Sequence, residues 1–323
     1  MKFLRNHWYV GALARAIGRQ PLQSWILGEP VVLFRKLDGE PVALRDRCPH
    51  RHAPLSLGKL VDDRIQCGYH GMQFDCTGAC TSIPGETAIP STLRVERFGV
   101  VEQHGLVWVW MGDPAQADES LVPQWPWCDR PGFQTYRGGF QIEAPFQMVI
   151  DNLMDLTHVH FVHSILGVGN LVHESEPMES WQDNNRVHFR RIMKKGALGA
   201  YAEVTGQYLP PSVVITSAVP KLEGSPDIQP GPVSQVLHCL TPIDEERTQY
   251  FVMKCWNITT RQHEIVAMHH QNEVTVAEDK AIIEAQWKIK RAFEREPEEK
   301  LIRADKAAVM CRRLHAKLTG AES

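Results

Sequence analysis

The first third of the chain consists of short runs of apolar and β-branched residues that are separated by turn residues. Short runs of this kind are typical of strands rather than helices. Two dipeptides between the runs, Asp38-Gly39 and Thr77-Gly78, tolerate the positive φ that tight hairpin turns require. The pattern predicts an all-β region with strands over residues 8–11, 25–27, 30–35, 41–46, 64–67 and 105–111.

A different pattern follows a passage rich in proline and tryptophan over residues 122–132, which is typical of a linker. Beyond it, apolar residues near the C-terminus recur with a period of 3.6, as they do in amphipathic helices. The pattern predicts helices over 145–158, 263–293 and 297–317, and strands over 186–194, 201–208, 212–219, 234–241 and 248–256. We therefore expect an α+β protein with an all-β domain over 1–121 and a mixed domain over 122–323.

Composition narrows the possible partners of this protein. With 43% hydrophobic and 23% charged residues, the chain is neither collagen-like nor disordered. A formal net charge of −3 gives no reason to expect nucleic acid or a membrane as a partner. The N-terminal residues lack the apolar segment of a secretory signal, so we expect a cytoplasmic protein. Its eight cysteines are then metal ligands, reactive thiols or buried apolar residues rather than disulfides.

Two short Cys/His pairs form the first candidate site. Cys48 and His50 are separated by one residue, and Cys67 and His70 follow after a gap of sixteen residues. Two thiolates and two imidazoles suit either zinc or a [2Fe–2S] cluster with mixed ligands. Zinc sites usually pair cysteine with cysteine at short spacing, whereas each pair here is mixed. The arrangement resembles the Rieske motif, and the Ile-Pro-Gly sequence at 83–85 resembles the proline loop that shields such clusters.

A histidine-rich segment over residues 152–163 forms the second candidate site. On a continuous helix Asp155 and His158 share a face, whereas His158 and His163 diverge by about 140°. These two histidines can therefore share a metal ion only if the helix ends or bulges between them. Two histidines and a remote carboxylate form the facial triad of non-haem Fe(II) oxygenases. The alternative is that His158, His160 and His163 are hydrogen-bonded locally around a helix end.

Periodicity alone does not identify the missing carboxylate, because Glu278, Asp279 and Glu284 all lie in the predicted helix over 263–293.

The order of these motifs resembles the oxygenase component of the Rieske non-haem iron oxygenases over nearly the whole chain. Segments 152–163, 278–280 and 303–313 are similar to the vanillate and dicamba O-demethylase branch of that family. The resemblance implies a Rieske domain followed by a helix-grip catalytic domain, an antiparallel sheet with helices. It also implies two cofactors, a [2Fe–2S] cluster on Cys48, His50, Cys67 and His70, and a mononuclear Fe(II) on His158, His163 and Asp279.

The same resemblance implies a homotrimer in which each cluster serves the iron of a neighbouring subunit. Asp155 would bridge a cluster histidine and an iron histidine across that interface. The residues agree with this role, because a carboxylate next to His158 can fix the tautomer of the ring. Tyr69 and Asn152 are expected beside the metal ligands. By resemblance His238 and His270 contact the substrate, and Ile165 and Leu166 line its pocket.

The resemblance implies a terminal oxygenase that uses dioxygen and two electrons from a separate reductase or ferredoxin. No flavin or nicotinamide fingerprint occurs in the chain itself. The preferred activity is O-demethylation of a methoxylated aromatic acid resembling vanillate, with release of formaldehyde. Ring or methyl hydroxylation of a sulfonate or heteroaromatic compound, and N-demethylation, remain alternatives. Two alternative interpretations of the chain are not oxygenases: a Rieske ferredoxin that only carries electrons, and a zinc-stabilised binding protein.

Overall fold

The computed structural model describes residues 3–163, 177–195, 200–222, 224, 233–257, 262–293 and 298–321. Contacts between residues divide the chain into two compact units. The N-terminal unit comprises Arg5–Gln124 and Thr241–Glu245, and the C-terminal unit comprises Met1–Leu4, Trp125–Leu240 and Glu246–Ser323. The boundary expected between residues 121 and 122 stays a prediction. No helix in the described part of the chain is both long and apolar enough to cross a membrane.

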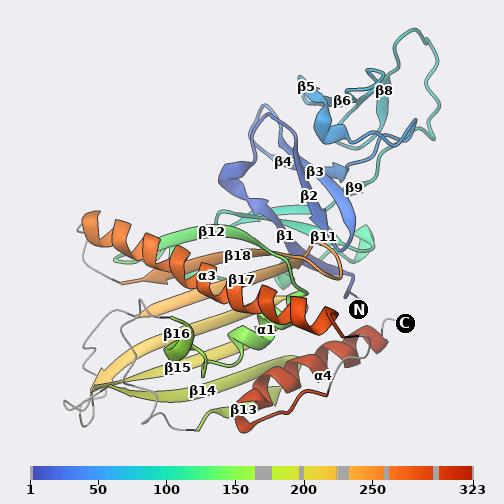
Figure 1. Cartoon of the computed structure of the whole chain (residues 1–323). Coiled ribbons are helices and arrows are strands. Elements are labelled where there is room, and N and C mark those ends of the chain that lie inside the picture. Colours follow the sequence, from blue (N-terminus) through green and yellow to red (C-terminus); the bar gives the residue numbers. More distant parts are fainter. Residues whose placement is uncertain are drawn as a thin grey trace. The chain divides into compact units, whose positions relative to one another are not determined.

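The N-terminal unit is built from three small antiparallel sheets (Figure 1). The first sheet has the order β1 (His7–Leu13), β11 (Leu106–Met111), β10 (Val100–Gln103). The second has the order β2 (Leu22–Ile26), β3 (Glu29–Arg35), β4 (Pro41–Arg45), β9 (Arg97–Phe98). The third has the order β5 (Lys59–Val61), β6 (Arg64–Gln66), β7 (Gln73–Phe74), β8 (Cys80–Ser82).

Burial in this unit follows from the sheet positions. Strand β11 lies between β1 and β10, and all six of its residues are buried. The turn that joins β10 to β11 contains His104 and Gly105, both with positive φ, as a tight hairpin of the right twist requires. A second core cluster contains Val32, Leu44 and Phe74 together with the two cysteines of the first candidate site. The cysteines are thus held by the hydrophobic core of the unit.

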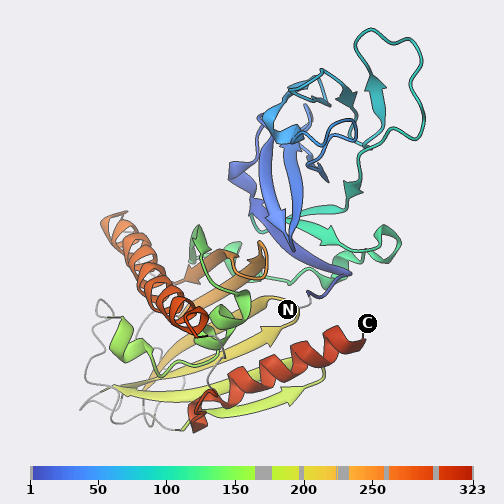
Figure 2. The same cartoon turned by 45° about the vertical axis from the view of Figure 1, so that its right-hand side comes forward.

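The C-terminal unit is one antiparallel sheet covered by helices. Its seven strands have the order β12 (Gln134–Ile142), β18 (Thr248–Trp256), β17 (Ser234–Pro242), β16 (Val213–Leu222), β15 (Ala200–Leu209), β14 (Arg186–Lys195), β13 (Glu179–Asp183). The helices are α1 (Phe146–Leu153), α2 (Val159–Val162), α3 (Gln262–Arg291) and α4 (Lys306–Ala321). Helix α3 crosses one face of the sheet (Figure 1), and α4 runs beside β13 and β14 (Figure 2).

The helices cover the same face of the sheet, because their buried residues belong to one core cluster. Strand residues such as Val252 and Phe189 share this cluster with Ile150 of α1, Val276 of α3 and Leu314 of α4. On β14 and β18 the cluster residues Val187, Phe189 and Met193, and Tyr250, Val252 and Trp256, are separated by even numbers of residues, as one face of a strand requires. The face beneath α3 is called the helix-covered face below.

The α+β class is confirmed, and the strands expected between 186 and 256 correspond to β14 to β18. The helix expected over 145–158 is wrong beyond Leu153. There the Asp155 carboxylate accepts hydrogen bonds from N and Oγ1 of Thr157, and this local turn replaces the helical bonds. The helix expected over 297–317 begins only at Lys306, because the Asp305 carboxylate caps the N–H of Ile302 in a preceding 3₁₀ turn.

The short strands β5, β7, β8, β9 and β10 of the N-terminal unit were not expected from the sequence, nor were two strands of the C-terminal unit. Strand β12 contains Gly138 and Gly139, which weaken the strand pattern, and β13 is an edge strand of largely polar residues.

Candidate metal centres

The first candidate site lies on two loops of the N-terminal unit, one after β4 and one after β6. Cys48 and Cys67 are buried, whereas His50 and His70 are exposed. The centroids of the two imidazole rings lie 4.6 Å apart. The N–H of Cys48 donates to the Ala53 carbonyl at 2.9 Å, and the N–H of Cys67 donates to the Met72 carbonyl at 2.8 Å. These bonds close each loop behind its cysteine.

The thiols and imidazoles of this site form two layers. Burial, with the adjacent Cys67 thiol, raises the pKa of Cys48 to about 11, so the Cys48 thiol stays protonated until a metal replaces the proton. Two buried sulfurs below two exposed ring nitrogens fit a cluster with one iron on thiolates and the other on imidazoles. The imidazole side faces solvent, where an electron can be exchanged.

Two neighbours of His70 shape the surface of this site. The ring of Tyr69 is exposed, and its centroid lies 3.8 Å from that of His70. Gly71 has a φ of 73°, and a Cβ at this position would lie 3.1 Å from Cγ of Pro84. The proline of segment 83–85 is therefore packed directly against the second Cys/His loop.

The second candidate site depends on the break between α1 and α2 in the C-terminal unit. His158 immediately precedes α2, and His163 immediately follows it with φ −96° and ψ 83°, which is not helical. The condition set by the five-residue spacing is thus met, because the helix ends before His163. The side chain of His160 lies outside the described part of the chain.

Asp279 of α3 joins the two histidines. Its Oδ1 lies 3.4 Å from Nε2 of His158 and 3.4 Å from Nε2 of His163. Two ligands about 2.1 Å from one ion and at right angles to each other are about 3 Å apart. One nitrogen from each ring and one carboxylate oxygen therefore converge as a facial triad of iron ligands would.

The opposite nitrogen of each ring is held by an oxygen. Nδ1 of His158 lies 2.6 Å from the main-chain oxygen of Asp155, and Nδ1 of His163 lies 3.0 Å from Oε2 of Glu278. An acceptor at Nδ1 places the hydrogen there and leaves the lone pair on Nε2, directed toward Asp279. Both rings are thus prepared as neutral metal ligands.

Two acidic residues next to the histidines hold the rings in ways that the sequence did not predict. The main chain of Asp155, not its carboxylate, holds the His158 ring, because the carboxylate is bonded to Thr157. Glu278, which periodicity did not distinguish from Asp279 and Glu284, orients His163. No sequence signal identifies this role, since it depends on the way α3 lies against α2. Asn152 lies beside the site as expected, and its Nδ2 donates to Oδ1 of Asp279 at 3.2 Å.

Two opposing effects set the pKa of His158. Burial disfavours the charged imidazolium, but the hydrogen bond and charge of Asp279 outweigh it and raise the pKa of His158. The His158–Asp279 pair therefore favours binding of a proton at the position where it would bind a metal ion.

The residues expected to contact substrate differ in placement. His238 lies on β17, is buried, and has both nitrogens occupied, Nδ1 by the Tyr250 hydroxyl at 2.6 Å and Nε2 by the Thr216 hydroxyl at 3.0 Å. Burial lowers its pKa to about 3, so the ring is neutral. His270 is exposed, whereas the adjacent His269 packs on Tyr136. Ile165 and Leu166 lie outside the described residues.

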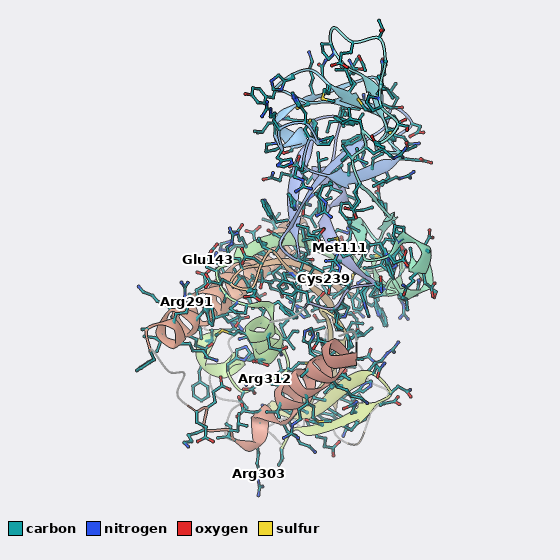
Figure 3. All side chains as sticks on the ribbon, turned by 90° about the vertical axis from the view of Figure 1, so that its right-hand side faces the viewer. Met111, Glu143, Cys239, Arg291, Arg303 and Arg312 are labelled. Atoms are coloured by element: carbon teal, nitrogen blue, oxygen red, sulfur yellow. The ribbon has the colours of Figure 1, made fainter. Side chains whose placement is uncertain are left out.

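A cavity of about 720 Å³ opens beside the second site, between α1, α3 and α4. Asn152, Asp155 and His158 line one end of it, and Arg312 lines another part. Figure 3 shows Arg312 on α4, where its guanidinium forms an ion pair with Asp151 of α1 at 2.6 Å. This pair fixes α4 against the helix that precedes the metal site.

Comparison with protein families assigns both units. The Rieske [2Fe-2S] domain matches residues 7–94, and the vanillate O-demethylase oxygenase C-terminal domain matches residues 142–321. The chain belongs to the Rieske oxygenases. It is an oxidoreductase with a [2Fe–2S] cluster domain, and the interpretations as a zinc-stabilised binding protein and as a simple ferredoxin are wrong.

Relatives of this Rieske oxygenase act on different aromatic compounds, as their names state. The dicamba O-demethylase oxygenase component of Stenotrophomonas maltophilia is 35% identical over 300 residues, which cover 88% of each chain. A toluene-4-sulfonate monooxygenase system iron-sulfur subunit of Comamonas testosteroni is 41% identical over 162 residues, 50% of this chain and 47% of that protein.

The fold of the oxygenase is also that of a solved relative. The crystal structure of dicamba monooxygenase with non-heme iron and dicamba has a TM-score of 0.85 and 30% identity, and covers 100% of this chain and 99% of that one. That crystal structure contains non-heme iron, and the donor set of His158, His163 and Asp279 fits an iron ion.

Proposed function

We propose that this Rieske oxygenase removes the O-methyl group of a methoxylated aromatic acid of the vanillate type and releases the methyl carbon as formaldehyde. The observation that carries the proposal is the convergence of His158, His163 and Asp279 within 4.8 Å of one another. This cluster lies in a domain matched to the vanillate O-demethylase oxygenase. The dicamba O-demethylase relative supports demethylation of an aromatic methoxy group.

The proposed reaction consumes dioxygen, two electrons and two protons, and it forms water and a hydroxylated methyl carbon. The resulting hemiacetal loses formaldehyde and leaves a phenol. When bound, the cluster and the ferrous ion supply single electrons and oxygen activation. Asp155 main-chain oxygen and Glu278 keep the two imidazoles in the ligating tautomer. Asn152 holds the Asp279 oxygen in place.

The proposal includes a separate electron donor and a homotrimer. The exposed imidazoles of His50 and His70 suit electron exchange with another protein. Asp155 lines the open cavity beside the iron ligands, and among the residues that the structure describes its carboxylate is hydrogen-bonded within its own turn, to Thr157. A histidine of a neighbouring subunit's cluster can therefore donate to the Asp155 carboxylate, which would connect the two metal sites through about one residue. Mass determination in solution should give three chains per particle.

The test is oxygen uptake and formaldehyde release with a surrogate reductase and a panel of methoxybenzoates. We expect one formaldehyde per dioxygen consumed for at least one methoxylated acid. His163→Ala should abolish formaldehyde while the visible spectrum of the cluster remains. His263→Ala, at an exposed position in the first turn of α3, is the matched control and should retain the cluster and the activity.

A second candidate function is hydroxylation of another aromatic anion, which the toluene-4-sulfonate monooxygenase relative supports. In that case the same panel would release no formaldehyde, and 4-toluenesulfonate would yield an alcohol. That outcome would replace demethylation by methyl hydroxylation.

A further inference from the structure

The helix-covered face of the sheet contains a cation that the metal chemistry does not use. Lys254 lies on β18, two residues from Val252 and two from Trp256, which are both buried in the core beneath the helices. Alternation along the strand places Lys254 on this same face. Its ammonium donates to Oδ1 of Asn272 on α3 at 2.9 Å. The lysine thus points between the sheet and the long helix.

We propose that Lys254, held by Asn272, is the anion-binding group for the carboxylate of the aromatic substrate. The assignment of a carboxylate rests on the proposed function. The anion site itself rests on the arrangement of the two side chains.

Both side chains have hydrogen-bonding capacity that the protein does not use. Over the described ranges, no carboxylate forms an ion pair with Lys254. Asn272 is only 7% exposed, and its Nδ2 has no hydrogen-bond partner among the residues whose placement is described. Because Oδ1 accepts from Lys254, the unpaired group must be the NH₂ donor. A carboxylate can accept from the ammonium through one oxygen and from this amide through the other.

The Lys254–Asn272 pair lies at a fixed distance from the iron ligands. Asn272 and Asp279 are seven residues apart on α3, so they share a face and are separated by about 10 Å along the axis. On β18, Lys254 and Tyr250 are four residues apart on one face, which corresponds to about 13 Å. Of these two separations, the one between Asn272 and Asp279 relates the pair to the proposed iron ligands, because Asp279 is one of them.

Both Asp279 and Lys254 act electrostatically on His238, with opposite sign. The negative charge of Asp279 acts to raise the pKa of His238, and the positive charge of Lys254 acts to lower it. His238 is neutral and both of its nitrogens are occupied, so it cannot supply a charge for an anion. Lys254 can, because its pKa, lowered by burial to about 8, still leaves it mostly protonated at pH 7.

Such a site selects anionic substrates over neutral ones of the same shape. A neutral compound leaves the buried ammonium and amide without a partner, and the loss of their hydration is not compensated. A planar carboxylate also matches two adjacent donors better than a tetrahedral sulfonate does.

The test compares binding of 4-methoxybenzoate, 4-methoxybenzenesulfonate and neutral 4-methoxybenzamide to the iron-loaded oxygenase under anaerobic conditions. Wild type should bind the benzoate most tightly. Lys254→Met should weaken benzoate binding by about 100-fold, because one partner of a buried charge pair is removed. Binding of the amide should change by less than about 3-fold. Asn272→Leu should weaken benzoate binding by about 10-fold.

Lys221→Met is the matched control, because Lys221 lies on β16 of the same sheet and is paired with Glu203. It should leave all three affinities unchanged. If Lys254→Met does not accumulate as folded protein, Lys254→Gln, which keeps a hydrogen-bond donor without the charge, carries the same expectation. In turnover assays of Lys254→Met, the KM for the acid should rise, whereas kcat should be largely retained.

Equal weakening of acid and amide would overturn the proposal, since a general change of pocket shape would then explain the loss. Unchanged benzoate affinity would overturn it too, and tighter sulfonate binding would overturn the carboxylate assignment. These outcomes are separable from failure of demethylation. An oxygenase that binds the acid through Lys254 but releases no formaldehyde contradicts the proposed reaction alone.

Discussion

At the scale of single residues, the proposed iron ligands are oriented by the atoms behind them. Each imidazole presents Nε2 to Asp279 because an oxygen already holds its Nδ1. One of these oxygens belongs to the main chain and cannot be removed by substitution. The other belongs to Glu278, so the importance of ring orientation can be tested at that position.

Glu278→Gln is expected to weaken iron binding by about 10- to 100-fold, as loss of an orienting carboxylate behind a ligand does. The glutamine amide oxygen can still accept a hydrogen bond from the His163 ring, but it carries no negative charge. Iron content after dialysis against a chelator, measured by plasma emission, checks this. Glu273→Gln, at an exposed acid of the same helix, is the control, and equal iron loss in both variants would contradict the role of Glu278.

Lys254 illustrates that a group kept for binding can reduce stability. Its pKa falls from 10.5 in the unfolded chain to about 8 in the fold because of burial. Between these values the unfolded chain binds more protons, so stability rises with pH from about 8 to about 10.5, and the full cost is present below pH 8. In the folded protein His238 and Tyr250, which share the helix-covered face, do not titrate in this window, since one pKa is about 3 and the other is raised well above 10. Tyr250 titrates near 10 in the unfolded chain, but this contribution is the same in wild type and variant and cancels in their difference.

Lys254→Met is therefore expected to raise the free energy of unfolding at pH 7 by about 3 kcal/mol. The gain should shrink steadily as the pH approaches 10. Thermal unfolding midpoints of wild type and variant at pH 7 and pH 9.5 measure the difference. Lys221→Met should show no such gain, and a gain that is independent of pH would show that charge burial is not its cause.

At the scale of elements, close packing between strands decides where the sheet tolerates a side chain. Gly206 of β15 pairs with Phe189 of β14, and a Cβ at this glycine would lie 2.0 Å from the ring. Gly139 of β12 is paired with Phe251 of β18, and a Cβ there would lie at an ordinary contact distance of 3.5 Å. These two glycines of one sheet thus differ in whether a larger side chain fits at their positions.

Gly206→Ala is expected to destabilise the protein by about 1–3 kcal/mol, because the Phe189 ring must leave its buried position. Gly139→Ala should change stability by less than about 0.5 kcal/mol. Denaturation midpoints of the two variants provide the comparison. Similar midpoints for both would mean that the ring moves aside without cost.

The break between α1 and α2 is the element that makes the iron site possible. Asp155 and Thr157 form a turn that ends one helix before another begins. A periodic pattern of apolar residues cannot reveal this break, because both helices follow the same pattern on either side of it. The histidine spacing did reveal it, since five residues on one helix cannot meet at one metal.

At the scale of the whole molecule, the proposed activity depends on electron transfer between two metal sites. We expect Asp155→Asn to retain both iron centres, because an asparagine oxygen can still accept from Thr157. Turnover should fall on the order of 100-fold or more, because the charged acceptor for a neighbouring cluster histidine is lost. Stopped-flow reoxidation of the reduced cluster, with iron and sulfide analysis, separates electron transfer from metal loss.

Thr157→Val is the control for this prediction, since it disturbs the turn but keeps the carboxylate. Near-normal coupled turnover in Asp155→Asn would contradict the bridging role. Loss of iron in that variant would instead assign Asp155 to the construction of the site.

The sequence by itself determined the two Cys/His pairs, the histidine segment and the order of an all-β and a mixed region. These features depend on spacing within a few residues, which the geometry of loops and helices preserves. The choice of Asp279 among three acids came from resemblance, because periodicity treats these acids alike.

Only the tertiary structure decided which atoms face one another across elements. It placed Glu278 behind His163, replaced the Asp155 carboxylate by the main-chain oxygen at His158, and brought Lys254 of β18 to Asn272 of α3. Partners of this kind are separated by many residues along the chain. Their contact depends on how a helix packs on a sheet, and a local pattern of polar and apolar positions contains no information about that packing.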